Sequence, residues 1–248
     1  MCARACGQGS GPSVGWTSGA LFDEAAADAA AAEDAAEAAA LRALRYAPGN
    51  PRVFLDVEIK GAPARRVRVL QHLQGTRAGT ERASAHAMLV CACAQMEFML
   101  FMSVSPRAAE NFLAMCRGDR GVAPRGSQGA GTRFSYEGAT FYRILDHFID
   151  QTGVNVPSVF GGSFDDDAGG LQLKHNRPGL LSMANAGRNT NTNHFSILLA
   201  PAPHLDGSYT IFGECVRGMD VVRDINALAT PSGTPNGRAL IVKAGQLS

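Results

Sequence analysis

Apolar and polar residues alternate along VFLDVEI at residues 53–59, and the turn-forming residues KGAP follow. Val53, Leu55 and Val57 occupy every second position, and a period of two is typical of a strand with one face toward a core. The pattern therefore predicts a strand that enters a hairpin.

Two helices are expected farther along the chain. In residues 106–116, Pro lies in the first turn, and helical spacing places Phe112 and Met115 on the face toward the core. Apolar residues also recur at helical spacing between Gly218 and Leu228. Many short strands and two helices indicate a barrel or a sandwich, mainly β, with a helix at each end. Further apolar runs predict strands at 98–101, 139–144, 179–183, 195–199, 211–213 and 240–242.

Residues 1–50 differ in composition from the rest of the chain. Gly and Ser are frequent in residues 1–20, which offer little apolar surface to offset the entropy of ordering. Residues 21–46 are rich in Ala, with acidic residues early, basic residues late and Pro48-Gly49 after them, an order that suits a helix dipole. We expect an N-terminal Ala-rich helical or disordered extension, either a low-complexity segment or one that docks to a partner.

Charge and hydropathy exclude several classes of partner. The chain has 23 Lys and Arg against 22 Asp and Glu, and a net charge of +1 gives no electrostatic basis for binding nucleic acid. The apolar run 87–94 is too short to cross a bilayer, and residues 1–20 lack the continuous apolar stretch of a signal peptide. We therefore expect a cytoplasmic protein without membrane contact.

The cysteines and histidines indicate no metal site. The six cysteines contain no CxxC pair, and the histidines near them lack the spacing of zinc ligands. His194 and His204 have no acid or Cys at ligand spacing and are interpreted as rim or core residues. Reduced thiols are expected at Cys2, Cys6, Cys91, Cys93, Cys116 and Cys215.

Seven segments resemble one known family in its own order. They are VFLDVEIKGAPARRV, SPRAAENFLAMC, YEGATFYRIL, HFIDQTG, LKHNRPGLLSMANAGRNTN, HLDGSYTIFGECVRGMDVV and AGQLS. They cover most of residues 51–248 and are similar to the cyclophilin-type peptidyl-prolyl cis-trans isomerases. The resemblance implies an eight-stranded antiparallel closed barrel capped by two α-helices, in a monomeric protein.

The resemblance also implies an enzyme that binds X-Pro segments of client proteins and assists their folding. Rotation about the prolyl bond has a barrier near ~20 kcal/mol because the nitrogen lone pair is conjugated with the carbonyl. Catalysis needs an apolar pocket for the ring and a cation that meets the nitrogen, but no nucleophile, metal or cofactor. In agreement, we recognise neither a Ser-His-Asp arrangement nor an HExxH motif in the sequence.

Site residues are implied position by position. The motif Phe141-Tyr142-Arg143-Ile144 gives Arg143 the family's catalytic role. Phe148 matches the aromatic floor of the pocket, and Gln151 matches a glutamine that bonds the peptide backbone. The implied substrate-binding residues are Phe148, Ile149, Gln151, Ala184, Asn185, Ala186, His194, Ser196, His204, Leu205 and Tyr209.

Three of these positions depart from the family pattern, and at a fourth the family itself varies. Ser196 replaces a pocket Phe, His194 replaces a Gln, and Tyr209 replaces a His; His204 stands where the family has Trp or His. Losing an aromatic wall at Ser196 is expected to cost about 1–3 kcal/mol of ring binding. We therefore expect weakened isomerase activity and weak binding of cyclosporin-like macrocycles. The alternative is a non-catalytic proline-peptide binding module or a scaffold in a larger complex.

An atypical insertion interrupts the motifs at about residues 68–95. In the family the strand near Arg66-Val67 continues directly, whereas here the pattern resumes at MEFMLFMSVSP. The insertion is either a long hairpin loop or translated intron, since Val codons begin GT and Gln95 can be encoded CAG. A third possibility is that it prevents the barrel from folding. A transcript that reads continuously through codons 68–95 would exclude the intron hypothesis.

Overall fold

The computed structural model describes residues 32, 35–36, 39–40, 42–60 and 94–248. The chain divides into two compact units, residues 1–42 and 43–248, and every strand lies in the second. Residues 32, 35–36, 39–40 and 42–45 are helical and residues 46–50 are not, which agrees with a predicted end before Pro48-Gly49. Most of the predicted extension lies outside the described residues, so the extension as a whole stays a prediction.

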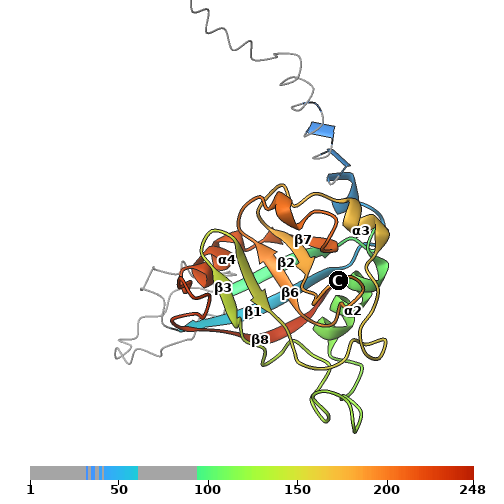
Figure 1. Ribbon diagram of the computed structural model, residues 1–248, viewed down its shortest axis with the longest axis vertical. Helices are drawn as coiled ribbons and strands as arrows, with labels where there is room; N and C mark the ends of the chain where they lie inside the picture. Colours follow the sequence, from blue (N-terminus) through green and yellow to red (C-terminus); the bar gives the residue numbers. More distant parts are fainter. Residues whose placement is uncertain (1–31, 33–34, 37–38, 41, 61–93) are drawn as a thin grey trace, which may run out of the picture. The chain divides into compact units, whose positions relative to one another are not determined.

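Eight strands form one antiparallel sheet in the order β3-β4-β6-β5-β7-β2-β1-β8. The protein is therefore mainly β, as expected, and several of its strands cross the middle of the domain in Figure 1. The strands are β1 (Arg52–Lys60), β2 (Ala94–Leu100), β3 (Arg143–Leu145), β4 (Ile149–Thr152), β5 (Leu180–Met183), β6 (Phe195–Leu198), β7 (Ile211–Arg217) and β8 (Arg238–Leu247).

The alternation in the first strand is confirmed. Val53, Leu55 and Val57 of β1 are fully buried, whereas the residues between them are partly exposed. β1 pairs with β2 on one side and with β8 on the other, so it lies inside the sheet. One buried face on a paired strand is the arrangement that a period of two predicts.

Each later predicted run falls at least partly within a strand, but the ends of several strands differ. The run 139–144 supplies only Arg143 and Ile144 to a ladder, in β3, because its first residues turn toward β8. The pattern also missed β4, which is four residues long and mixes polar with apolar side chains. A strand this short carries too little alternation to be recognised.

The strand ladders do not close the sheet into a barrel, because β3 and β8 remain as its two edges. Backbone hydrogen bonds nevertheless join the segment before β3 to β8. The Phe141 N–H donates to the Ala239 carbonyl at 3.1 Å, and the Ile241 N–H donates to the Ala139 carbonyl at 2.9 Å. The closed barrel stays a prediction that these bonds support.

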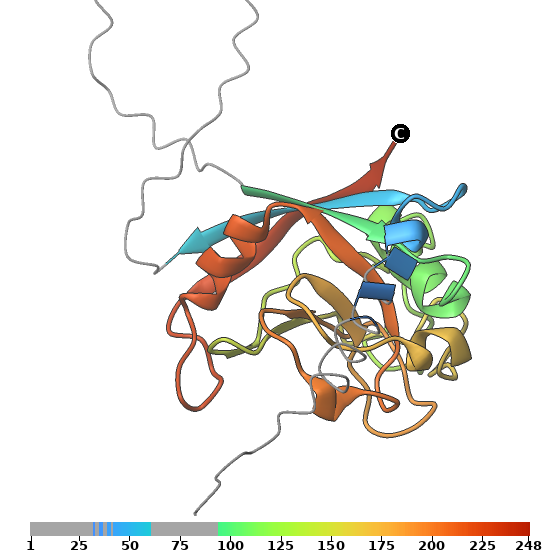
Figure 2. The ribbon, with the colours of Figure 1, turned by 90° about the horizontal axis from the view of Figure 1, so that it is seen from above.

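Both predicted helices are confirmed as α2 (Pro106–Arg117) and α4 (Met219–Asn226). They lie toward opposite ends of the sheet in the two views (Figure 1) (Figure 2). Two short elements were not predicted, namely α3 (Ala168–Gln172) and the 3-10 helix η1 (Pro203–Leu205). No helix within the described ranges is long and apolar enough to span a membrane.

The first turn of α2 is capped from another part of the chain. Its own N-cap residue, Ser105, makes no side-chain capping bond. Instead, the carboxylate of Asp167 accepts hydrogen bonds from the backbone N–H groups of Arg107 and Ala108, at 3.2 and 2.9 Å. These N–H groups have no partner inside the helix, so Asp167 satisfies donors that would otherwise stay unpaired.

Phe112 of α2 lies at the centre of an aromatic core, as the helical spacing predicts. Its ring centroid is 4.8 Å from that of Phe195 in β6 and 5.2 Å from that of Phe212 in β7. Tyr136 lies 5.0 Å away and also contacts Phe195. Met115, the second predicted core residue of this helix, is fully buried. The helix therefore packs against β6 and β7, the two strands that flank β5 in the sheet.

Residues 68–93 of the predicted insertion lie outside the described residues. The last two residues of the expected insertion, Ala94 and Gln95, belong to β2, where they pair with Val57 and Asp56 of β1. The apolar pattern of MEFMLFMSVSP begins after Ala94 and Gln95, which already pair in the β1–β2 ladder. β1 and β2 thus pair although residues 61–93 separate them.

We predict that Phe112→Ala lowers the free energy of unfolding by about 3–5 kcal/mol, because it removes a large buried ring and leaves a cavity. Chemical denaturation measures the loss. Phe160→Ala is the matched control, because Phe160 is 39% exposed, and it should cost less than about 1 kcal/mol. Equal losses in the two variants would contradict the central role of Phe112.

Candidate functional site

A cavity of about 240 Å³ opens between β4, β5, β6 and the η1 segment. Every substrate-binding residue expected from the sequence lines it except Ala186 and His194, and Arg143 lines it as well. Sequence reasoning missed Ser182 and Met183. The lining residues are Arg143, Phe148, Ile149, Gln151, Ser182, Met183, Ala184, Asn185, Ser196, His204, Leu205 and Tyr209.

Arg143 and Gln151 face each other across the β3–β4 ladder. They are direct partners in the register, and the Arg143 Nη1 group donates a hydrogen bond to Gln151 Oε1 at 3.5 Å. The Arg143 side chain is exposed at the mouth of the cavity. Opposite positions in an antiparallel pair share one face of the sheet, so the ladder itself brings these two groups together.

Aromatic and apolar side chains form one wall of the cavity. Phe148 follows the turn between β3 and β4, and its ring centroid lies 5.2 Å from the His204 ring in η1. Ile149 and Leu205 extend this wall. The wall can accept an apolar ring from a ligand.

A short strip after β5 provides backbone groups along one rim. The Ala184 N–H donates to the His194 carbonyl at 2.9 Å, and Asn185 Nδ2 donates to the Ser208 carbonyl at 3.1 Å. Ala186 does not line the cavity but lines an adjoining hollow of about 560 Å³, which shares Asn185 and Tyr209 with it. The strip therefore borders two neighbouring depressions.

His194 lies behind the rim rather than in the cavity. Its Nδ1 atom is 3.0 Å from the Tyr142 hydroxyl, and the two rings meet edge to face. A Cβ at Gly153 would lie 2.5 Å from His194 Nδ1, so the glycine makes room for the ring. Burial lowers the pKa of His194, which favours the neutral ring. His194 therefore does not line this cavity, and its expected part in substrate binding stays a prediction.

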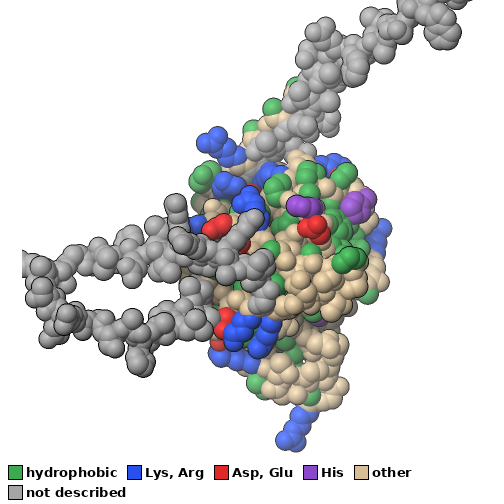
Figure 3. All heavy atoms as spheres, turned by 90° about the vertical axis from the view of Figure 1, so that its left-hand side faces the viewer, with side chains coloured by type: hydrophobic (Ala, Val, Ile, Leu, Met, Phe, Trp, Pro, Cys, Tyr) green, Lys and Arg blue, Asp and Glu red, His purple; other side chains and the backbone are tan. Residues whose placement is uncertain are grey.

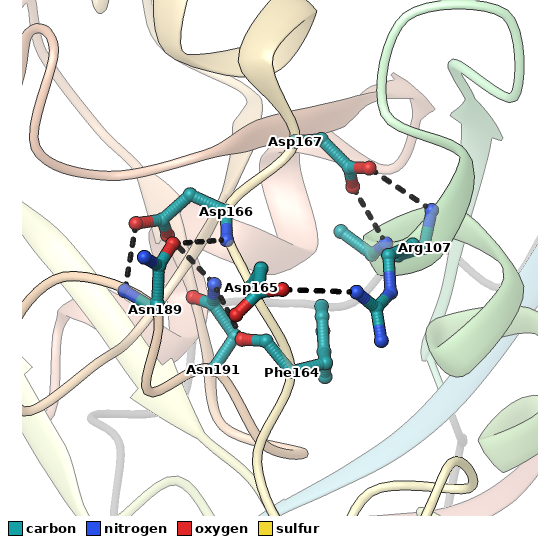
Figure 4. Close-up of polar contacts among 8 residues, drawn as sticks. Arg107, Phe164, Asp165, Asp166, Asp167, Asn189 and Asn191 are labelled. Carbon is teal, nitrogen blue, oxygen red and sulfur yellow. Dashed lines mark hydrogen bonds and ion pairs between the residues drawn. The ribbon is translucent and has the colours of Figure 1, made fainter.

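Figure 4 shows the loop of Asp165–Asp167 beside the loop that carries Asn189 and Asn191. The Asp166 N–H donates to Asn189 Oδ1 at 3.0 Å, and the Asn189 N–H donates back to Asp166 Oδ2 at 2.9 Å. Asn191 Nδ2 donates to Asp166 Oδ1 at 2.7 Å. These reciprocal bonds fix the loop that follows the strip at Ala184–Ala186.

The same loop is tied to α2. Arg107 Nη1 lies 3.4 Å from Asp165 Oδ2, while the Asp167 carboxylate caps the helix (Figure 4). Asn189 has φ 61°, a left-handed conformation that Asn tolerates better than most residues. Three consecutive acidic residues therefore connect the rim of the site to the first turn of the helix.

A Ser-His-Asp chain adjoins the cavity, which Ser182 lines, contrary to the sequence expectation that none is present. His175 Nδ1 is 2.9 Å from Asp206 Oδ1, and His175 Nε2 is 3.0 Å from Ser182 Oγ. His175 is fully buried and Ser182 is 2% exposed. His175 and Ser182 lie in one segment, LKHNRPGLLSMAN, whereas Asp206 lies farther along the chain in HLDG, and only the tertiary fold brings it to His175. The sequence resemblance assigns these three residues no role.

Electrostatics fix the protonation of this chain. Desolvation by burial lowers the pKa of His175, so the ring is neutral near pH 7. Desolvation opposes ionisation of Asp206 too, but hydrogen bonds from the His175 backbone and ring outweigh it and lower the pKa of that carboxyl. The Nδ1–H group therefore donates to the carboxylate, and the bare Nε2 accepts the Ser182 hydroxyl proton.

A second buried acid lies on the opposite face of β4. Asp150 is fully buried, and burial raises its pKa to about 7, although a hydrogen bond from Asn226 Nδ2 to Asp150 Oδ1, at 2.8 Å, opposes the shift. Its Oδ2 atom has no partner among the described residues. Asn226 also donates to the Leu145 carbonyl at 3.0 Å, so this pair joins β4 and the β3–β4 turn to α4.

The described residues contain no group of three His, Cys, Asp or Glu side chains that could hold a metal ion. His194 contacts Tyr142, whereas His204 contacts Phe148. Cys116 and Cys215 are buried free thiols, and burial raises the pKa of each. Buried thiols with raised pKa values are poor nucleophiles.

Comparison with known families supplies one match. The family model described as cyclophilin type peptidyl-prolyl cis-trans isomerase/CLD matches residues 90–246, more than half of the chain. The match spans every residue that lines the cavity. It begins after β1, which therefore lies outside it.

We predict that His175 stays neutral at pH 6.5, with a proton on Nδ1 and none on Nε2, because burial lowers its pKa from the ordinary 6.5. ¹⁵N–¹H NMR of the ring nitrogens between pH 8 and 5 tests this, with His175→Gln to assign the signals. The unfolded chain binds the His175 proton near pH 6.5, whereas the folded state binds it only at a lower pH. The contribution of the His175–Asp206 pair to stability is therefore lost as the pH falls below about 6.5. A half-charged ring at pH 6.5 would contradict it.

We also predict that Asp150→Asn stabilises the protein at pH 8 by roughly 2–4 kcal/mol, and less at pH 5. The folded state holds the Asp150 proton up to pH of about 7, whereas the unfolded state loses it near pH 3.8. Wild-type stability from this group therefore falls as the pH rises between those values, and the variant removes that loss. Denaturation at both pH values measures the effect, with exposed Asp146→Asn as control; the same gain at both values would refute the buried-acid explanation.

Proposed function

The chain belongs to the cyclophilin-type peptidyl-prolyl cis-trans isomerase family, and from that premise we propose that it catalyses rotation about X-Pro bonds of client proteins. The observation that carries this proposal is the placement of Arg143 and Gln151. The two lie side by side at the mouth of a cavity with an aromatic and apolar wall. This is the combination that isomerisation requires: a ring pocket, a backbone anchor and a cation.

The proposed mechanism uses binding and electrostatics alone. Phe148, Ile149 and Leu205 hold the proline ring, while the Gln151 amide bonds the peptide backbone. The Arg143 guanidinium then donates an N–H group to the prolyl nitrogen as its lone pair leaves conjugation with the carbonyl. A donor that meets this nitrogen only in the twisted state lowers the barrier without forming a covalent bond.

Weakened activity is part of the proposal. Ser196 lies in the cavity with its side chain 7% exposed, at a position where the family has an aromatic wall. A serine offers less apolar contact to a proline ring, so we propose weaker ring binding. His204 stacks on Phe148 at the rim, and we propose that a His there also reduces cyclosporin binding.

A non-catalytic peptide-binding module is the second candidate. The polar lining at Ser182 and Ser196 favours it, because a pocket that binds proline poorly gains little stabilisation of the twisted state. Both candidates place an extended X-Pro segment along the strip at Ala184–Ala186. They differ only in whether Arg143 accelerates the rotation.

The charge distribution supports a peptide ligand over a polyanion. On the face in Figure 3, the Lys and Arg side chains of described residues lie in several small groups, some beside acidic residues, rather than in one continuous patch. A nucleic-acid surface needs a connected basic area. We therefore propose client polypeptides as the partners of this chain.

We predict that the protein accelerates cis/trans exchange of a short Ala-Pro peptide and that Arg143→Ala reduces the acceleration about 100-fold. NMR exchange spectroscopy measures the rate, because uncatalysed exchange takes tens of seconds. Arg120→Ala, which removes an exposed Arg far along the sequence, should leave the rate unchanged. Peptide binding without acceleration in the folded wild type would leave the binding module as the function.

A further inference from the structure

The floor of the cavity carries two hydroxyl groups on neighbouring strands. Ser182 of β5 and Ser196 of β6 are direct partners in the antiparallel register, and both line the cavity. Opposite residues of a pair lie on the same face, about 5 Å apart at Cβ. A ligand group at this point of the floor therefore meets both serines.

The two hydroxyls have different hydrogen-bonding states. The Ser182 proton is directed to His175 Nε2 at 3.0 Å, and Asp206 holds that ring with its bare nitrogen toward the serine. The Ser182 oxygen thus keeps only lone pairs for the cavity. Within the described part of the chain, the Ser196 hydroxyl makes no hydrogen bond, so it can both donate and accept.

This floor matches a ligand hydroxyl better than a bare hydrocarbon ring. A ring hydroxyl donates to the Ser182 oxygen and accepts from the Ser196 hydroxyl, which pairs both serine hydroxyls. An unsubstituted ring covers the Ser196 hydroxyl without offering it a partner, and sites built on hydrogen bonds discriminate against ligands that lack the matching polar group. A serine at position 196 also takes less volume than an aromatic side chain, which leaves room for one more oxygen atom.

The geometry points to a specific substrate class: we propose that the cavity prefers X-Pro segments whose proline carries a ring hydroxyl, that is, 4-hydroxyproline. This inference rests on the proposed function, because it assumes that a prolyl ring occupies the cavity. His175 and Asp206 act as positioning residues, since they set the direction of the Ser182 hydroxyl and do not touch the ligand.

A Ser-His-Asp chain also suggests a nucleophilic serine, but the surroundings of Ser182 argue against it. Acyl transfer needs free N–H donors beside the nucleophile to stabilise an oxyanion. The next two backbone N–H groups are already used, because Met183 donates to the Thr210 carbonyl and Ala184 to the His194 carbonyl, each at 2.9 Å. The chain therefore orients a hydroxyl rather than activating it.

The test compares binding of three short peptides that differ only at one ring: Ala-Pro, Ala-(4R)-hydroxyproline and Ala-(4S)-hydroxyproline. NMR titration of the whole protein gives each Kd. We expect one epimer to bind about 3- to 10-fold more tightly than the proline peptide, as one or two neutral hydrogen bonds provide. Proline binding as tight as both epimers would overturn the inference.

Variants identify the groups responsible. Ser196→Ala should bring the ratio of the two Kd values close to one, and it should bind the proline peptide no more weakly than the wild type. Ser182→Ala should also reduce the ratio. Ser127→Ala, whose hydroxyl bonds only the Pro124 carbonyl in a surface loop, is the control and should keep it. An unchanged ratio in folded Ser196→Ala, checked by thermal unfolding, would refute the role of this hydroxyl.

Exchange rates separate this inference from the proposed function. Each catalysed rate is divided by the uncatalysed rate of the same peptide, because a ring hydroxyl alters the rotation itself. Tighter hydroxyproline binding with no acceleration of any peptide would reject the isomerase and keep the inference. Equal acceleration and equal affinity for all three peptides would keep the isomerase and reject the inference.

Discussion

Packing of the Phe112 ring against Phe195 and Phe212 is the contact on which the domain depends. It joins α2 to β6 and β7, which lie on either side of β5 in the sheet. The cavity lies on β5 and β6, since Ser196 of β6 directly follows Phe195 and pairs with Ser182 of β5. Because alternate side chains of a strand point to opposite faces, one strand supplies both the core and the site. Ligand geometry is therefore set by core packing rather than by loop conformation alone.

The same alternation explains how β4 combines chemistry with support. Ile149 and Gln151 line the cavity, whereas Asp150 and Thr152 are fully buried on the other side. Asp150 connects to α4 through Asn226, so the helix holds the strand that carries Gln151. Polar groups inside a fold are costly unless paired, and their presence on this strand indicates that its position matters. A four-residue strand thus has its register fixed from both faces.

Much of the fold and most of the cavity could be predicted from the sequence. Period-two alternation identified β1, helical spacing identified the inward faces of α2 and α4, and motif order placed Arg143 and Gln151 at one site. What the sequence does not show has a physical cause. His194 does not line the cavity, and a sequence does not show that Gly153 leaves space for its ring. The contact of His175 with Asp206 depends on tertiary packing of two segments that are apart in sequence, which carries no local period.

The position of β1 has a consequence for how the domain is divided. β1 precedes the region that matches the family, yet it lies between β2 and β8 and hydrogen-bonds to both. A fragment cut to residues 90–246 would keep the whole cavity lining but lose this inner strand. Two long rows of unpaired backbone groups would then be open to water, and such rows are templates for pairing between molecules. Self-association of that fragment would follow from the lost strand even though every residue that lines the cavity remains.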